Sequence, residues 1–123
     1  MSEPQRQLPA STILLVDDEE FVRRMMRRIL GAAGHRVLEA EDGLQALRTL
    51  DRDATSVRLV ISDVAMPRMS GDELAAELRV RWPEIPILLI SAYARNVTSD
   101  VDFLAKPFDS ETLLRRVGAL IAQ

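Results

Sequence analysis

The sequence predicts an α/β sandwich in which a five-stranded parallel β-sheet carries helices on both faces. Short runs rich in Val, Ile and Leu recur along the chain, and amphipathic helical patterns lie between them. The length of 123 residues is enough for one domain with one core. Strands that alternate with helices are typical of βαβ units, which place a parallel sheet between two helical layers.

Five segments are candidate strands, because each is a short apolar run of the kind that is buried on both faces of a parallel sheet. The second segment is more polar than the others, as expected for a strand at the edge of a sheet. The segments cover residues 12–16, 36–40, 57–61, 87–90 and 101–105.

Four segments show the periodicity of amphipathic helices. In the first, an apolar stripe that includes Phe21 and Met25 lies opposite four arginines. Ser70 and Glu73 have the spacing of a capping box at the start of the third, and Pro83 predicts its end. The helical patterns cover residues 21–30, 44–50, 74–82 and 113–121.

Composition excludes several classes of site. The 16 Lys and Arg against 19 Asp and Glu give a formal net charge of −3, so direct binding of nucleic acid is not expected. The sequence has no cysteine and one histidine, which excludes thiol chemistry and Cys- or His-rich metal sites. Any bound metal must therefore be held by oxygen atoms.

The chain is expected to be cytoplasmic and not inserted in a membrane. Its apolar runs are all shorter than the ~20 residues that span a bilayer, and the polar N-terminus has no apolar signal core. Residues 1–10 include two prolines, so we expect a flexible tail or linker there. The folded domain is then residues 11–123.

Polar residues follow the apolar runs at the strand ends where open α/β sheets form their sites. Asp17 and Asp18 follow the first run, Asp63 and Ser91 follow the third and fourth, and Lys106 follows the fifth. If the strand order is 2-1-3-4-5, the three acids share one pocket. Carboxylates ~4 Å apart repel by ~4 kcal/mol per pair at an effective dielectric of ~20, which favours a bound cation or proton uptake. Oxygen ligands favour Mg²⁺ over zinc or copper, and the lysine and hydroxyl suit phosphoryl chemistry.

Four motifs at four strand ends carry a family resemblance. They are LLVDDE at 14–19, ISDVAMPRMSG at 61–71, LLISA at 88–92 and LAKPF at 104–108. Through them, residues 12–122 resemble the receiver domain of bacterial two-component response regulators. The resemblance implies a doubly wound, flavodoxin-like three-layer sandwich with strand order 2-1-3-4-5. It also implies a phosphorelay switch that catalyses its own phosphorylation and dephosphorylation, not an enzyme with a separate substrate.

The resemblance implies a role for each matching residue. Asp63 would accept a phosphoryl group from a phosphohistidine of a histidine kinase or histidine phosphotransfer domain. Asp18, Asp63 and the backbone carbonyl of Ala65 would ligate Mg²⁺, for which Mn²⁺ can substitute, and Asp17 would act through a metal-bound water. Lys106 would contact the phosphoryl oxygens.

The same resemblance implies how the signal is relayed and how long it lasts. Ser91 and Phe103 match the family's switch pair, and the Lys106–Pro107 peptide bond is expected to be cis. Ala65 and Tyr93 occupy the two positions that commonly tune the lifetime of the phosphoryl group. Since neither is an acid or an amide that could orient water, we expect slow self-dephosphorylation.

The interval between the last two motifs is shorter than the family's pattern. Ser91 and Lys106 are only 15 positions apart, which leaves about nine residues between the last two strands, fewer than the dozen that a parallel crossover usually takes. The fourth helix of the family is therefore expected to be short or absent, and the family's usual dimer is not carried over to this chain.

The first helix presents arginines that are either a solvated face or a docking face for an acidic kinase partner. They are Arg23, Arg24, Arg27 and Arg28.

Three other functional classes place different demands on the sequence. A dehalogenase-like phosphatase would need an Asp-x-Asp motif after the first strand, where this chain has Asp17 and Asp18 adjacent. A nucleotide binder would need a Ser-, Thr- or Gly-rich loop there. A degenerate receiver that acts as a phosphorylation-independent adaptor remains the alternative.

Overall fold

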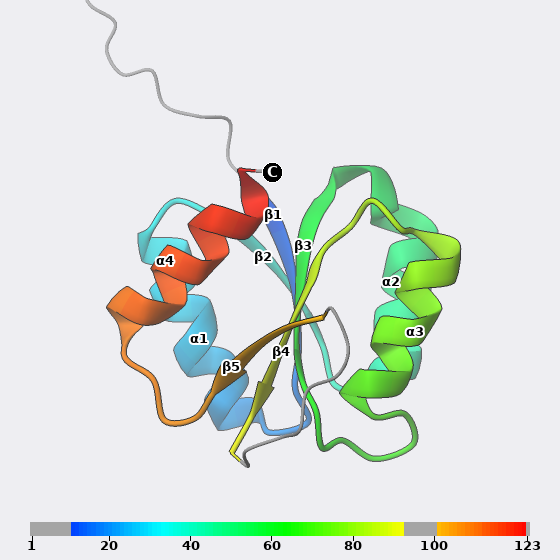
Figure 1. Ribbon diagram of the computed structural model, residues 1–123, viewed down its shortest axis with the longest axis horizontal. Coiled ribbons are helices and arrows are strands. Elements are labelled where there is room, and N and C mark those ends of the chain that lie inside the picture. The colour runs from blue at the N-terminus through cyan, green and yellow to red at the C-terminus, as the bar shows by residue number, and fades with distance from the viewer. Residues whose placement is uncertain (1–10, 93–100, 123) are drawn as a thin grey trace, which may run out of the picture.

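The computed structural model describes residues 11–92 and 101–122. The expected tail at residues 1–10 and the expected short fourth helix, which falls on residues 93–100, lie outside this part. Within it, five strands form one sheet with helices on both sides (Figure 1). The elements are β1 Thr12–Val16, α1 Glu20–Ala32, β2 Arg36–Ala40, α2 Gly43–Asp53, η1 Ala54–Ser56, β3 Val57–Asp63, α3 Gly71–Arg81, β4 Ile87–Ser91, β5 Asp102–Ala105 and α4 Ser110–Ile121.

The sheet has the predicted order β2-β1-β3-β4-β5, and each pair of neighbouring strands is parallel. The register aligns the carboxyl ends of the strands. Val16 pairs with Ala40 on one side and with Ser62 on the other, so the residues after β1 and at the end of β3 are neighbours. This edge of the sheet is therefore the place where a site can form.

Alternate strand residues face opposite sides of the sheet, so the core has two halves. Leu14 packs toward α2 and α3, whereas its neighbours Ile13 and Leu15 pack toward α1 and α4. Figure 1 shows these two helical pairs on the two faces of the sheet. The strands are thus anchored by apolar burial on both sides, which stabilises the positions of the residues at their ends.

The predicted elements differ from the observed ones mainly at their ends. The strands at 12–16 and 36–40 are confirmed, β3 and β4 extend further to include Asp63 and Ser91, and β5 begins at Asp102. The capping box of Ser70 and Glu73 is present at the start of α3. In the described residues, no helix combines the length and the apolar content that a membrane span requires.

The predicted core stripe of α1 is wrong at two positions. Phe21 is 74% exposed and Met25 is 47% exposed. The stripe that packs on the sheet is narrower than predicted: Met26 and Leu30 are buried, and Val22 and Ile29 are partly buried against the same half of the core. Phe21 and Met25 each precede a stripe residue by one position, about 100° around the helix, and so face away from the sheet.

Candidate functional site

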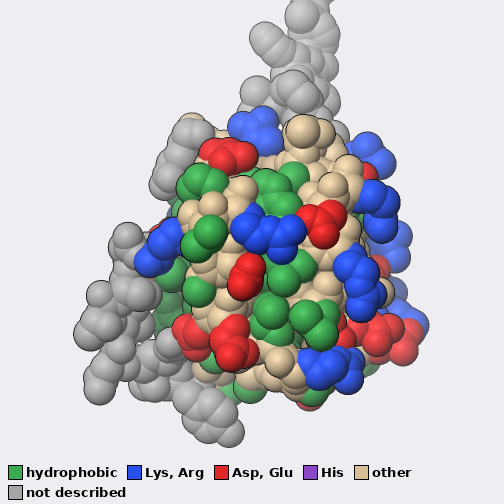
Figure 2. Space-filling model, turned by 90° about the vertical axis from the view of Figure 1, so that its right-hand side faces the viewer, with side chains coloured by type: hydrophobic (Ala, Val, Ile, Leu, Met, Phe, Trp, Pro, Cys, Tyr) green, Lys and Arg blue, Asp and Glu red, His purple; other side chains and the backbone are tan. Residues whose placement is uncertain are grey.

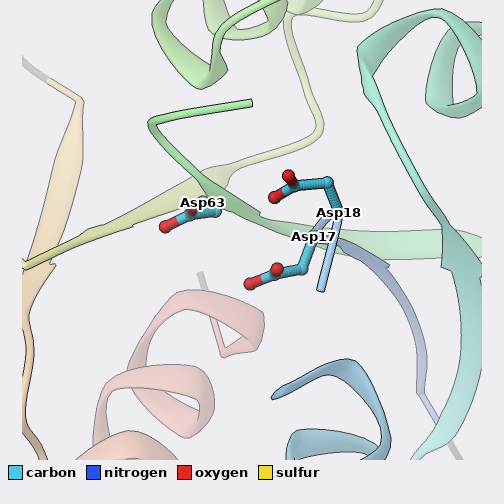
Figure 3. A group of neighbouring side chains, drawn as sticks. All are labelled: Asp17, Asp18 and Asp63. Carbon is cyan, nitrogen blue, oxygen red and sulfur yellow. The ribbon is translucent and has the colours of Figure 1, made fainter. Parts of the chain in front are cut away.

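Three carboxylates meet at the carboxyl edge of the sheet. Asp17 and Asp18 follow β1, and Asp63 is the last residue of β3. One oxygen from each side chain lies within 4.8 Å of the other two. Figure 3 shows the three side chains together at this edge, with Asp17 buried, Asp63 half-buried and Asp18 exposed. The sequence-predicted acids are therefore brought into one cluster.

The turn after β1 is held by hydrogen bonds on several sides. The Asp17 amide donates to the carbonyl of Ala40 (3.1 Å), and one Asp17 carboxylate oxygen accepts from the Glu19 amide (2.8 Å). Arg23 donates from Nη1 to the Asp17 carbonyl (2.7 Å) and from Nε to Glu39 Oε1 (2.9 Å). The turn, and with it the Asp17 carboxylate, is fixed relative to β2 and α1.

The loop after β3 folds back tightly over Asp63. The Val64 amide donates to the carbonyl of Ile90 (2.9 Å), and the Gly71 amide donates to the carbonyl of Val64 (2.8 Å). A Cβ at Gly71 would overlap the Asp63 carbonyl oxygen. A side chain is thus excluded at this position, where α3 begins directly beside Asp63.

A lysine lies beside the cluster, and a serine ends the neighbouring strand β4. Lys106 Nζ lies 3.4 Å from Asp63 Oδ1, and its amide donates to the carbonyl of Ser91 (2.8 Å). Ser91 is a buried residue at the end of β4, next to β5. The Lys106–Pro107 peptide bond is cis. Residues that follow β1 and β5 therefore meet the last residue of β3 at one edge of the sheet, where β4 also ends with Ser91.

The electrostatics of the cluster favour binding of a cation. Burial raises the pKa of Asp17, the Glu19 amide opposes this rise, and repulsion by Asp63 adds to it. Burial also raises the pKa of Asp63, although Lys106 lowers it. One lysine beside three carboxylates leaves the cluster with more acidic than basic groups. A donor set made only of oxygen atoms with excess negative charge fits a hard divalent cation such as Mg²⁺.

The predicted switch, lifetime and docking residues have different surroundings. Phe103 is half-buried against the α2/α3 half of the core, and its carbonyl accepts from Arg116 Nη2 (3.0 Å). Ala65 is exposed in the loop after β3, and Pro107 is exposed after Lys106. Tyr93 lies outside the described residues.

The four arginines of α1 do not form one uniform surface. Arg23 has a side chain only 11% exposed, and it pairs with Glu39 beside the acidic cluster. Arg27 also pairs with Glu39 (3.0 Å), and Arg24 pairs with Glu20 (2.7 Å). The role of Glu39 was missed because it lies in the polar edge strand, where an acid is ordinarily solvated.

The chain is similar to proteins of known family along most of its length. The family described as "Response regulator receiver domain" matches residues 13–118. "Sensor kinase CckA" of Brucella abortus is 38% identical over 119 residues, which are 91% of this chain and 13% of that protein. "Response regulator protein FleR" of Pseudomonas aeruginosa is 38% identical over 89% of this chain and 24% of that protein. The chain thus spans less than a quarter of the length of both.

Solved structures of receiver domains and response regulators are also similar to this chain. The receiver domain of the hybrid histidine kinase CckA has a TM-score of 0.80 and 40% identity, covering 90% of this chain and 99% of that one. The response regulator TrrA from Thermotoga maritima, solved in complex with Mg²⁺-BeF, has a TM-score of 0.81 and 32% identity, covering 89% and 98%. The fold, the strand order and the sequence match point to one conclusion: the chain belongs to the response regulator receiver domain family.

Proposed function

We propose that the chain is a phosphorylation-controlled switch of a two-component phosphorelay, in which Asp63 accepts a phosphoryl group from a phosphohistidine in the presence of Mg²⁺. The observation that carries the proposal is the convergence of three carboxylates within 4.8 Å, with Lys106 3.4 Å from Asp63. The similarity to TrrA, which was solved with Mg²⁺-BeF, supports the choice of ion. Mn²⁺ is expected to substitute, because it accepts the same oxygen ligands.

The side chains of Asp18 and Asp63 and the carbonyl of Ala65 would hold the ion, and Asp17 would act through an intervening water. When bound, Mg²⁺ supplies positive charge to the oxygens of the transferred phosphoryl group. The Lys106 ammonium supplies further positive charge from the β5 side. The site then provides positioning and counter-charge, which are the main requirements of in-line phosphoryl transfer.

In the transfer step, one bond to phosphorus forms as another breaks. An Asp63 carboxylate oxygen attacks phosphorus, and an acyl phosphate forms as the bond between phosphorus and the donor's imidazole nitrogen breaks. The electron pair of that bond returns to the imidazole. The chain thereby catalyses its own phosphorylation, and later the hydrolysis of its acyl phosphate by water, without a separate substrate.

The signal would pass from Asp63 to the surface through Ser91 and Phe103. The new phosphoryl oxygens attract the Ser91 hydroxyl, and its movement leaves space that the Phe103 ring can enter. Phe103 is half-buried on the edge strand β5, so a rotation of its ring would change the surface of the protein at this edge of the sheet. Phosphorylation would shift a pre-existing equilibrium between two states.

The phosphodonor would be a histidine kinase or a histidine phosphotransfer domain that docks on α1. Phe21 and Met25 are exposed on this helix, and Arg24, Arg27 and Arg28 are exposed beside them. An apolar centre with a basic rim suits a partner with an acidic surface. Because such kinases take phosphate from ATP, we place the receiver in the cytoplasm.

The direct test is labelling by acetyl phosphate with Mg²⁺. We expect stoichiometric labelling of the wild type and none of Asp63→Asn, while the matched variant Asp51→Asn, on α2 and away from the cluster, is labelled normally. Lys106→Ala should remain folded but show a smaller change of the Phe103 NMR signals on phosphorylation. A wild type that takes no label would favour the adaptor alternative, and undiminished labelling of Asp63→Asn would remove Asp63 from its role.

A further inference from the structure

An ion pair connects the loop after β3 to the start of α2. Arg68, in this loop, donates from Nη2 and Nε to Asp42 Oδ2 at 2.5 and 3.2 Å. Asp42 is the N-cap residue of α2, and its other oxygen accepts from the Gln45 amide (2.8 Å). Since Asp42 is only 7% exposed and is fixed by the helix that it caps, it offers the arginine a rigid anchor.

Arg68 holds a backbone conformation that disfavours an arginine. Its φ is 68°, in the left-handed region, which is unfavourable for a residue with a side chain and costs glycine little. Two charge-assisted hydrogen bonds to a single oxygen of the buried Asp42 carboxylate offset this cost. The hydrogen bond from Arg68 is also the main cause that lowers the pKa of Asp42.

The next loop residue makes a second contact with α2. Met69 lies directly against Gly43, because a Cβ on this glycine would come within 2.7 Å of the methionine Cγ and Sδ and within 2.8 Å of its Cβ. Two successive loop residues are thus seated on the first turn of α2. Figure 2 shows the molecular face formed by α2 and α3, where basic, acidic and apolar side chains intermix.

The loop is therefore fixed at both ends. At one end Val64 is hydrogen-bonded to the carbonyl of Ile90, and at the other Arg68 is held by Asp42. Residues 65–67 lie between these anchors, and among them Met66 packs against the α2/α3 half of the core. The direction of the Ala65 carbonyl, which the proposed function assigns to the metal, thus depends on where Arg68 is held.

We propose that Asp42 and Arg68 form a loop latch that holds the β3–α3 loop against α2 and so orients the Ala65 carbonyl toward Mg²⁺. In this inference, which rests on the proposed function, Arg68 is a positioning residue that contacts neither the metal nor the phosphoryl group. The latch joins two positions 26 residues apart in the chain. It makes the metal affinity of the acidic cluster depend on α2.

The sign of the effect separates positioning from simple electrostatics. Arg68 is a cation on the loop that follows Asp63, so its charge alone opposes the binding of another cation. If Arg68 acted only through its charge, removing it would strengthen Mg²⁺ binding. If Arg68 positions the loop, removing it weakens Mg²⁺ binding.

Two variants break the latch without disturbing other features. Arg68→Gly removes the guanidinium and accepts the left-handed backbone. Asp42→Asn keeps an oxygen that can cap α2 and removes the charge that holds Arg68. The matched control is Arg81→Gln, which breaks another Arg–Asp pair between α3 and α2, Arg81 Nη2 to Asp51 Oδ1 at 2.5 Å, at the far ends of these helices.

The first measurement is Mg²⁺ affinity of the unphosphorylated proteins by isothermal titration calorimetry. We expect each latch variant to raise the Kd for Mg²⁺ by about tenfold, the lower limit of what partners of metal ligands contribute. The double variant should be no weaker than either single one, because both remove the same contact. Arg81→Gln should bind Mg²⁺ like the wild type, and thermal melting should show all four proteins folded.

The second measurement is the initial rate of labelling by acetyl phosphate as a function of Mg²⁺ concentration. The half-saturating concentration should rise about tenfold in the latch variants, whereas the rate at saturating Mg²⁺ should stay within about twofold of the wild type. A Kd for Mg²⁺ that is unchanged or lower in Arg68→Gly would overturn the latch. A wild type without label would refute the proposed function alone, because the calorimetry tests the latch independently.

Discussion

Replacing Asp17 by Asn is expected to stabilise the metal-free protein and to weaken its binding of Mg²⁺. The change removes one negative charge from the cluster of Asp17, Asp18 and Asp63. It keeps the oxygen that accepts the Glu19 amide hydrogen bond at 2.8 Å. The local turn should therefore persist, and the difference in stability should report mainly the repulsion among the acids.

The magnitude follows from the spacing of the carboxylates. Their oxygens lie within 4.8 Å of one another, and two unit charges at that distance repel by about 3.5 kcal/mol at an effective dielectric of ~20. Asp17 faces two such neighbours, but Asp18 is exposed and Lys106 attracts all three acids. We expect a net gain of about 1–2 kcal/mol in the free energy of unfolding, or roughly 5 °C in Tm per kcal/mol.

The gain in the free energy of unfolding from Asp17→Asn should become smaller as the pH falls. Burial, with repulsion from the neighbouring acids, raises the pKa of Asp17 in the folded state. An ionised Asp17 thus costs the folded wild type free energy at neutral pH, and this cost disappears as the pH falls through the raised pKa toward the ordinary value of about 4. The stability advantage of Asp17→Asn should accordingly be largest near neutral pH and shrink with acidification.

Urea denaturation in EDTA and again in Mg²⁺ provides the assay. At 100 times its Kd, Mg²⁺ should stabilise the wild type by about 2.7 kcal/mol, and it should stabilise Asp17→Asn less. Glu84→Gln, an acid-to-amide change at the opposite end of the sheet, is the control and should show neither effect. If Asp17→Asn were less stable than the wild type in EDTA, repulsion would not dominate this cluster and the reasoning would be wrong.

Two further outcomes are expected. The phosphorylated protein should keep its phosphoryl group for minutes or longer in gel assays, because Ala65 offers no group to orient the attacking water. Ala65→Asn should shorten this lifetime. A wild-type half-life of seconds would contradict the expectation. Arg68 and the Gln45 amide lower the pKa of Asp42 in the folded state, so its contribution to stability is present at neutral pH and is lost as the pH falls through that lowered value. Urea titrations below about pH 4 should therefore show a smaller loss of stability for Asp42→Asn than for the wild type, and equal losses would refute the assignment.

Much of the fold and the cluster could be predicted because the signals are local. An uninterrupted apolar run predicts a buried strand, and the polar residue after it predicts the site edge, as for Asp17 and Asp63. The Ser70–Glu73 capping box needs only four consecutive residues, and it is present. The strand order came from the family resemblance and is confirmed.

Other features could not be predicted because they depend on how distant segments pack. Phe21 and Met25 have the periodicity of core residues, but the sheet covers a narrower stripe of α1 than the pattern predicts. The sequence pattern of Arg23 is that of a surface arginine, but in the structure its Nε lies 2.9 Å from Oε1 of Glu39, 16 residues away. No pattern within α1 indicates that Arg23 pairs with a residue of β2.

The segments that become strands and helices, and the polar residues at their ends, can be predicted from sequence because apolar periodicity and capping are patterns of a few neighbouring residues. The approach of three acids to within 4.8 Å of one another and the contact of Arg68 with Asp42 require the folded chain. Those distances depend on the register of β1 against β3 and on the packing of the β3–α3 loop against α2. Register and packing are properties of the whole core, so no single segment encodes them.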